Sequence, residues 1–493
     1  MSCTRWRSFG PALLSIFLML IISNPANGQL STMGKEFWVG FMENNRSLPS
    51  GNNSGNPDFA VIVISADENA TGVIEHLGSS TSFSLVAGQQ FTFRMPSLTQ
   101  DLLHRTTGVI ENKGIHITST GKIVILPVAT LGKDYYITSH YEFQVNGNNN
   151  ESTLLVVATE DNTQIEITTS VATLSGNVAK VPSIITLNRG QSYQIKARDD
   201  LTGSRIRVVG TNADDCKKIS VFGGNKWTRV GNCGAANDHL FQQAYPVNTW
   251  GTSFVHVALE GRSSGELVKV VAAEAGTEVF VNGTSRGTLN QAEWMSIAFG
   301  EDESAKIVTS KPASVTVFSK SMECNRANSP EARSGDPFMI TYSPVEQLLK
   351  RISFNAMALP AITVHYVNLV VNKGSESKTI LDGQNVGGSF SPLSGDPNFS
   401  IARISISQGI HRLENSDGFT AYVYGFGEIE SYGYAAGAAL DNFNFIPEAS
   451  YDFDINGEKV ACLDVEALWD IKSENPNFTY FIWNFGDGTA AKI

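Results

Sequence analysis

Apolar residues in this chain form short runs between polar turns. Runs such as "GKIVILPV" (121–128), "STLLVVAT" (152–159) and "ASVTVFSK" (313–320) are rich in Val, Ile, Thr and Phe, and Gly, Asn and Ser separate them. β-Branched and aromatic residues favour strands, and long stretches rich in the helix formers Leu, Ala, Glu and Lys are rare here. The pattern predicts an all-β protein.

Four segments with a shared pattern recur along the chain. They are "GKEFWVGF" (34–41), "GKDYYITS" (132–139), "ANDHLFQQ" (236–243) and "SGDPFMIT" (334–341). Each places a small residue before an acid, and aromatic or apolar residues follow. The acids, Glu36, Asp134, Asp238 and Asp336, are 98, 104 and 98 residues apart. An apolar strand, a turn into a further strand and a closing strand follow each segment in the same order.

These landmarks predict an internal fourfold repeat, with units near 34–131, 132–235, 236–333 and 334–440. A unit of roughly 100 residues is larger than a propeller blade and has the size of a β-sandwich. We therefore expect tandem β-sandwich-like units. A single larger, interwoven β-assembly is the alternative that the pattern leaves open.

The N-terminus has the pattern of a secretory signal peptide over residues 1–28. Arg5 and Arg7 precede an apolar run over 12–22, and small residues at 26–28 supply a cleavage site. The run of 11 residues is shorter than the roughly 20 that span a bilayer, and no later segment suits membrane insertion. The formal charge of −12 argues against nucleic acid or an anionic membrane as partner. We expect a secreted or cell-surface protein.

Four cysteines follow the predicted signal: Cys216, Cys233, Cys324 and Cys462. Cys216 and Cys233 enclose a strand, a turn and an irregular return. In an oxidising compartment we expect a disulfide between these two, and two buried free thiols are the alternative. None of the four has the Cys-x-x-Cys spacing of a zinc site, so no structural metal is predicted.

The pattern changes after about residue 445. "WNFGDGT" (483–489) resembles the W-x-F-G-D-G motif of the polycystic-kidney-disease (PKD) family of Ig-like domains. The resemblance implies that Trp483 and Phe485 pack into a sandwich core. Gly486, Asp487 and Gly488 would form the tight turn after them, as their backbone preferences allow. Because 447–493 is short for such a domain, we expect a truncated PKD-like domain and a longer parent protein.

One short segment has a partial calcium pattern. "DFDING" (452–457) places Asp452, Asp454 and Asn456 at alternate positions, as a calcium loop does. The bidentate Glu of such a loop is replaced by Leu463. A strand followed by an Asn-Gly turn is therefore the favoured interpretation. We predict no cofactor, and calcium is the weaker alternative.

Several motifs together resemble a known family. "GKEFWVGFMEN", "LVVATEDNTQIEI", "DHLFQQAYPVNTWG", "GDPFMITYSPVEQ" and "YGFGEIESYGYAAG" are similar to the N-terminal domain family named after the mammalian IgG Fc-binding protein. Within it, the chain resembles the bacterial branch on secreted proteins of gliding bacteria, which commonly carry PKD-like modules. The resemblance covers roughly residues 34–440. It implies a secreted, surface-associated binding or adhesion role, and it does not carry Fc binding over to this chain.

Catalysis is not expected. "GRSSG" (261–265) and "GTSRG" (283–287) match G-x-S-x-G, yet both lie in polar turns between strands, where a nucleophile elbow needs a strand and then a helix. The eight histidines are scattered. His239 beside Asp238 resembles an acid/base pair, but we interpret it as a structural residue at a unit junction.

Two functional hypotheses remain open. In the first, the protein binds a glycan or an extracellular protein ligand at a cell surface. Trp227 and Trp250 are then the candidate contact aromatics, since exposed indoles stack on sugars; burial at unit junctions is the alternative for both. In the second, the chain is a passive structural stalk that spaces a C-terminal functional region from the cell surface. Exposed aromatic clusters would favour the first hypothesis.

Overall fold

The computed structural model describes residues 30–440 except 32, 46–59, 67, 95–100, 127–130, 145–149, 211–216, 235 and 360. The predicted signal peptide, the calcium candidate Asp452/Asp454/Asn456 and the PKD-like motif lie outside the described residues. Cys216 does too. In the described part, strands dominate and the helices are short 3-10 turns, so the all-β prediction is confirmed.

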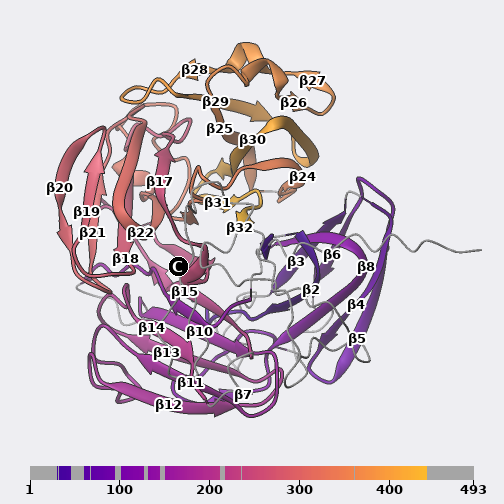
Figure 1. Ribbon diagram of the computed structural model, residues 1–493, viewed down its shortest axis with the longest axis vertical. Coiled ribbons are helices and arrows are strands. Elements are labelled where there is room, and N and C mark those ends of the chain that lie inside the picture. Colours follow the sequence, from indigo (N-terminus) through magenta and orange to yellow (C-terminus); the bar gives the residue numbers. More distant parts are fainter. Residues whose placement is uncertain are drawn as a thin grey trace, which may run out of the picture.

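The strands form four sectors, which succeed one another along the chain (Figure 1). In sector 1 the sheet order is β5-β4-β8-β3-β6, and β2 pairs with β8. The bounds are β1 (Leu30–Ser31), β2 (Met33–Val39), β3 (Val61–Ala66), β4 (Ala70–His76), β5 (Ser79–Leu85), β6 (Gln90–Arg94), β7 (Ile110–Glu111) and β8 (Ile115–Leu126).

Sector 2 has two separate sheets, β12-β11-β14-β9 and β16-β15-β10-β13-β7. The short strand β7 thus leaves sector 1 to join its neighbour. The bounds are β9 (Asp134–Tyr136), β10 (Ser152–Ala158), β11 (Thr163–Thr168), β12 (Pro182–Leu187), β13 (Ser192–Ala197), β14 (Arg205–Val208), β15 (Ile219–Thr228) and β16 (Asp238–Gln243).

In sector 3 the order is β20-β19-β22-β18-β21, and β17 and β23 both pair with the long strand β22. The bounds are η2 (Val247–Thr249), β17 (Gly251–His256), β18 (Glu266–Ala272), β19 (Thr277–Val281), β20 (Thr284–Leu289), β21 (Trp294–Ala298), β22 (Ala305–Ser319), η3 (Met322–Cys324) and β23 (Met339–Thr341).

In sector 4 the order is β27-β26-β30-β25-β29-β28, and β24 and β31 pair with the long strand β30. The bounds are β24 (Leu349–Ala356), β25 (Ile362–Asn372), η4 (Glu376–Lys378), β26 (Ile380–Leu381), β27 (Gln384–Asn385), η5 (Gly387–Ser389), β28 (Ser391–Pro392), β29 (Phe399–Ile406), β30 (Gly409–Gly427), β31 (Glu430–Ala435) and β32 (Ala439–Leu440).

The sectors share an unusual register. Between the opening strand and the long strand of sector 1, the pairing moves from Gly34↔Ile123 to Glu36↔Thr118. The same step of two residues against five recurs between β17 and β22 and between β24 and β30. In sector 2 the long strand is divided into β14 and β15; β9 pairs with β14, and Gly132, two residues before β9, forms a bridge with Ile219 of β15. The repeated irregularity identifies β2, β9, β17 and β24 as equivalent strands.

The structure places two strands in different sheets from those that the predicted unit boundaries imply. "DHLFQQ" (β16) and "FMIT" (around β23) were expected to open units three and four. Instead, β16 pairs with β15 and β23 pairs with β22, each the strand that ends the preceding sector. Boundaries at 236 and 334 therefore separate these strands from the sheets to which they hydrogen-bond. The strands that open sectors 3 and 4 are β17 and β24.

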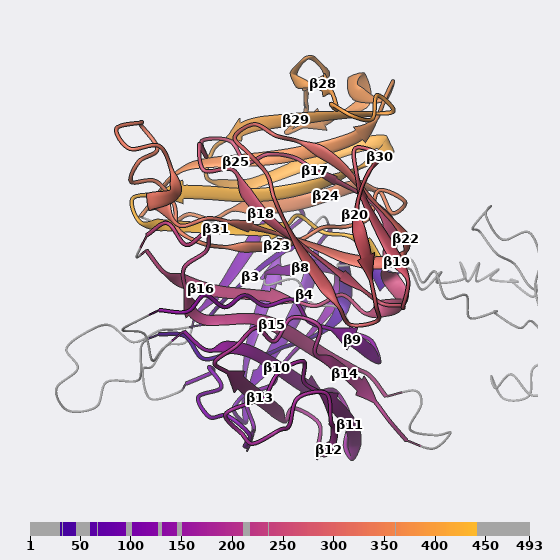
Figure 2. The ribbon, with the colours of Figure 1, turned by 90° about the vertical axis from the view of Figure 1, so that its left-hand side faces the viewer.

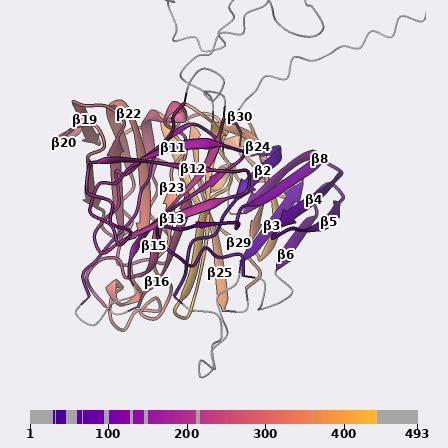
Figure 3. The ribbon, with the colours of Figure 1, turned by 90° about the horizontal axis from the view of Figure 1, so that it is seen from below.

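The sectors close into a ring rather than lying end to end. Figure 1 shows sectors 1 to 4 following one another around a common centre, and the first described strand, β1, pairs antiparallel with the last, β32. In Figure 2 sector 3 faces the viewer between sectors 4 and 2. Figure 3 shows sector 2 from outside, with sector 1 beside it. One apolar cluster includes residues of all four sectors, such as Leu126, Tyr136, Val271 and Val423.

Candidate functional site

Junctions between neighbouring sectors bring three equivalent positions together. The first lies on the opening strand of a sector, the second is its cross-strand partner, and the third lies on a turn of the next sector. The 1–2 junction has Trp38, His116 and Arg189 at these positions, and the 2–3 junction has Tyr136, Arg205 and Gln291.

Backbone hydrogen bonds establish the equivalence of Arg189 and Gln291. In sector 2 the Gly190 amide donates to the Ala158 carbonyl (2.9 Å), and in sector 3 the Ala292 amide donates to the Ala272 carbonyl (3.0 Å). Gly190 and Ala292 both have left-handed φ, +77° and +66°. The two turns are therefore the same structure, and they present their second residue to the preceding sector.

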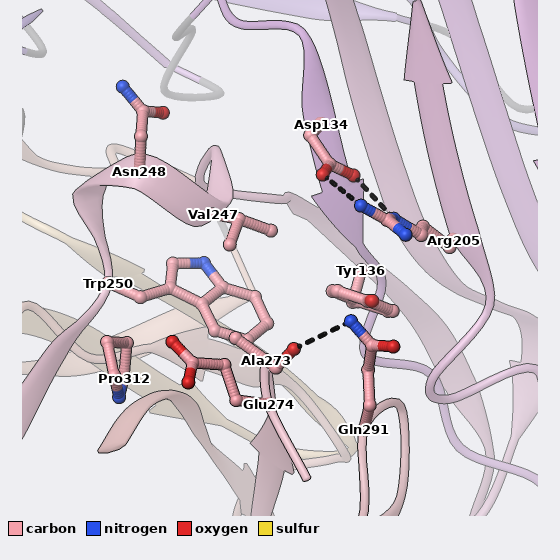
Figure 4. Close-up of a pocket in the computed structure, with 10 residues that line it drawn as sticks. All are labelled: Asp134, Tyr136, Arg205, Val247, Asn248, Trp250, Ala273, Glu274, Gln291 and Pro312. Carbon is pink, nitrogen blue, oxygen red and sulfur yellow. Dashed lines mark hydrogen bonds and ion pairs between the residues drawn. The ribbon is translucent and has the colours of Figure 1, made fainter. Parts of the chain in front are cut away.

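A cleft of about 210 Å³ opens at the 2–3 junction (Figure 4). We call it the 2–3 cleft. Its walls come from β9 and β14 of sector 2. In sector 3 they come from η2 and the residue after it, from the turns that follow β18 and β20, and from β22. The lining residues are Asp134, Tyr136, Arg205, Val247, Asn248, Trp250, Ala273, Glu274, Gln291 and Pro312.

An ion pair forms the sector 2 side of the cleft. Arg205 Nε donates to Asp134 Oδ1 (2.9 Å) and Arg205 Nη2 donates to Asp134 Oδ2 (2.5 Å). The guanidinium carbon lies 5.4 Å from the centre of the Tyr136 ring. The hydrogen bond to Asp134 raises the pKa of Arg205, and burial raises the pKa of the Tyr136 phenol. Both groups thus keep their ordinary neutral-pH forms, cation and neutral phenol.

Trp250 and two polar residues form the sector 3 side. The indole of Trp250 lies 5.9 Å from the Tyr136 ring, tilted by 50°, and its Nε1 donates to the Tyr245 carbonyl (3.0 Å). Gln291 Nε2 donates to the Ala273 carbonyl (3.1 Å), and the amide lies beside Tyr136 (Figure 4). Glu274 is 58 % exposed and its carboxylate is 4.0 Å from Lys311 Nζ. The cleft thus combines an aromatic floor with amide and carboxylate groups.

The equivalent position at the 1–2 junction is filled. Arg189 lies over the Trp38 ring, 5.3 Å from its centre, and its Nη2 is 3.2 Å from His116 Nδ1. The His116 ring stacks on Trp38 at 4.3 Å, and its two nitrogens contact Glu36 (2.9 Å) and Glu75 (2.6 Å). Arg189 therefore occupies the space that Gln291 leaves open.

The 3–4 junction is filled by another pair. Lys306, the cross-strand partner of Val255, lies 3.7 Å from the centre of the Phe399 ring and 3.9 Å from Asp396 Oδ2. Asp396 lies on the turn of sector 4 before β29, the same place as Arg189 and Gln291. Of these three junctions, the 2–3 junction has the cleft, and at the other two a cation lies close to an aromatic ring.

A Ser–His–Glu group at the 1–2 junction resembles a catalytic triad but is buried. His104 Nδ1 is 2.9 Å from Ser192 Oγ, and its Nε2 is 3.3 Å from Glu111 Oε1. Ser192 and His104 have no exposed surface, so no substrate reaches the hydroxyl. Burial lowers the pKa of His104 to about 4. The group fastens sector 1 to sector 2, and we assign it no chemistry.

The predicted Cys216–Cys233 disulfide is corrected by the structure. Cys233 forms its disulfide with Cys324, across the 2–3 junction and 91 residues away. A sulfur takes part in one disulfide, so Cys233 is not available to Cys216. Spacing along the chain suggested the nearer cysteine, whereas the fold brings the segment between β15 and β16 into contact with η3, which carries Cys324.

The two predicted contact tryptophans lie in different places. Trp250 is 4 % exposed and lines the 2–3 cleft, whereas Trp227 is half-buried on β15, and the cleft does not include it. The backbone amide of Trp227 donates to Asn225 Oδ1 (2.8 Å).

His239 is half-buried, stacks on Phe241 at 5.8 Å and has its pKa lowered to about 4 by burial. These contacts suit a structural His239.

Tyr136, Arg205 and Gln291 were not singled out from the sequence. Aligning the turns "NRGQ" (188–191) and "NQAE" (290–293) would have drawn attention to Gln291, since the other copy carries Arg at that place. Arg205 lay beyond such reasoning, because it pairs with Asp134 across strands 71 residues apart. Within the described residues, no group of three or more His, Cys, Asp or Glu is placed to hold a metal ion.

Comparison with known proteins shows that the chain matches a known family. A family model described as IgGFc binding protein matches residues 121–425, which include the whole 2–3 cleft. A search of curated proteins found no match. In the part of the chain that the structure describes, no helix has the length and apolar character that crossing a membrane requires.

Proposed function

The chain belongs to the IgGFc binding protein family, and from this premise we propose that it is a secreted, non-enzymatic protein that binds a glycan or an extracellular protein ligand. The observation that carries the proposal is the 2–3 cleft. Its floor is aromatic, and polar groups converge on it from two sectors, as in small-ligand sites. The closed and equivalent 1–2 junction supports the idea that the opening is specific to this position.

The predicted signal peptide supports export, and the resemblance to the secreted proteins of gliding bacteria supports an adhesion role at the cell surface. The PKD-like segment after residue 447 belongs to the same proposal. Fc binding is one protein-ligand case within it, and the family description alone suggests it.

The passive stalk is the second candidate, and ring closure argues against it. Because β1 and β32 are neighbouring strands, the chain enters and leaves sectors 1–4 at the same place. A spacer is effective when its two ends are far apart, and a ring that begins and ends at the same place adds little distance between them. What favours a rigid structural role is the buried Lys269 at the 2–3 junction, which bonds to Asp200 and to the Ser139 carbonyl.

The test is a binding screen of the secreted chain on glycans and host glycoproteins, immunoglobulin included. We expect saturable binding that falls at least tenfold in Gln291→Arg, because the longer side chain should cover Tyr136 as Arg189 covers Trp38. Arg189→Gln, at the sealed junction, is the matched control and should bind like the wild type. Silence of folded wild-type protein across the screen would favour the stalk.

A further inference from the structure

Resting on the proposed function, we infer that the 2–3 cleft takes one uncharged pyranose ring of a glycan and excludes acidic sugars. The size of the cleft supports a single ring. Its volume of about 210 Å³ is below the roughly 300–1,000 Å³ of pockets for drug-sized molecules. An extended oligosaccharide would therefore place one residue inside and the others on the surface.

The chemistry of the walls suits a sugar. A pyranose presents an apolar C–H face and hydroxyls that both donate and accept hydrogen bonds. Val247 and Pro312 supply apolar surface together with the small exposed parts of Tyr136 (3 %) and Trp250 (4 %), and the amide of Gln291 and the carboxylate of Glu274 supply polar contacts. An amide both donates and accepts, which matches a hydroxyl better than it matches a purely apolar or purely ionic ligand.

The charges of the walls exclude acids. Among the ten lining residues Arg205 is the one cation, and Asp134 already holds it through two parallel hydrogen bonds. Such a bidentate pair uses the fork that would otherwise bind a ligand carboxylate. Glu274 adds a carboxylate at the mouth, 4.0 Å from Lys311 Nζ. A uronate or sialate would meet the carboxylates of Asp134 and Glu274 and no free guanidinium, whereas an uncharged pyranose meets no such repulsion.

The first experiment measures saturation-transfer NMR of the mature chain with methyl pyranosides. The probes are uncharged hexoses and N-acetylhexosamines, each beside a uronic acid or sialic acid probe. We expect signals from at least one uncharged probe, loss of those signals in Gln291→Arg, and none from the acidic probes. Signals from an acidic probe with the wild type would overturn the inference.

The second experiment changes the charge. In Asp134→Asn the guanidinium of Arg205 loses its carboxylate partner, and we expect acidic probes that are silent with the wild type to give saturation-transfer signals. Glu274→Gln should give weaker signals. Each variant is shown to be folded by its thermal transition. If the acidic probes still do not bind to either variant, the charges of Asp134 and Glu274 are not what excludes acidic sugars.

The two proposals fail in different ways. If a glycoprotein ligand binds in the screen and Gln291→Arg abolishes that binding, while all free sugars stay silent, the sugar inference is wrong and the binding function stands. If nothing binds in either assay, both fail.

Discussion

The 1–2 and 2–3 junctions are built alike and differ in outcome. Each sets an aromatic ring of an opening strand below a turn of the next sector, and the two turns have the same hydrogen bonds. Arg189 covers Trp38 at one, whereas the shorter Gln291 leaves Tyr136 beside an open cleft at the other. We infer that the side chain at this turn position decides whether the junction is sealed or forms a site.

The junctions also differ in how they are held together. The 1–2 junction uses the buried His104–Ser192–Glu111 group and the ion pairs of Glu43 with Lys196 and Lys226. The 2–3 junction has a fully buried lysine and a disulfide. Because these contacts hold sectors 2 and 3 together, the 2–3 junction does not depend on a capping side chain at the cleft.

The largest effect is expected from removing Lys269. Its ammonium group is 1 % exposed, bonds to Asp200 and lies 4.3 Å from the centre of the Trp294 ring. In Lys269→Met the carboxylate of Asp200 loses its cation, and the free energy of unfolding should fall by about 3–5 kcal/mol. Chemical denaturation measures this. The control is Lys378→Met, whose pair with Asp417 is exposed and should contribute little to stability. Equal losses in the two variants would contradict the account.

The disulfide should come next. Cys324→Ser removes a link that restricts a long loop of the unfolded chain, and the free energy of unfolding should fall by about 2–4 kcal/mol. A thiol reductant should shift the wild-type transition by a similar amount and leave that of the variant in place. If the reductant shifts both transitions equally, another disulfide is responsible.

At the 1–2 junction the expected effect depends on pH. Burial lowers the pKa of His104 to about 4, against 6.5 in the unfolded chain. Between these pH values the unfolded state binds a proton at His104 that the native state does not. The contribution of neutral His104 to the free energy of unfolding is therefore complete above pH 6.5. It falls as the pH drops toward 4, by at most about 1.4 kcal/mol per pH unit. Since His239 also has a pKa of about 4, the measurement compares slopes of wild type and His104→Gln. The variant should have the shallower slope, and a steeper one would be contrary to expectation.

The smallest effect on stability is expected from Arg189→Gln. Removing the guanidinium from the Trp38 ring should cost about 0.5–1 kcal/mol, the usual size of such a contact near the surface. Tryptophan fluorescence should report greater solvent access in the variant, as a small cleft opens over Trp38. If the fluorescence spectrum is unchanged and Trp38 stays protected from a quencher, side chains other than Arg189 seal this junction.

The sequence predicts some of these features and misses others for physical reasons. Local alternation of residues predicted the strands, and the spacing of Glu36 and Asp134 found two equivalent strands, β2 and β9. It misplaced the next two openings, because β16 and β23 carry the same kind of residues but pair with the preceding sheet. Strand pairing is a long-range property, and ring closure through β1 and β32 has no local signal.

The candidate site was predictable to a smaller extent. Trp250 could be singled out from the sequence as a large aromatic residue near a turn. The hydrogen bond from its indole N–H to the Tyr245 carbonyl could not be predicted in that way. The Cys233–Cys324 bond and the Asp134–Arg205 pair join residues 91 and 71 apart. Only the folded ring brings them into contact.

The most direct test of the central claim, that an open turn position makes the 2–3 cleft a binding site, is the affinity of Gln291→Arg for the ligand found in the screen. A crystal structure of the variant should show the new guanidinium over Tyr136. The account predicts at least a tenfold weaker affinity with an unchanged thermal transition. Wild-type affinity in a variant whose Arg covers Tyr136 would contradict it.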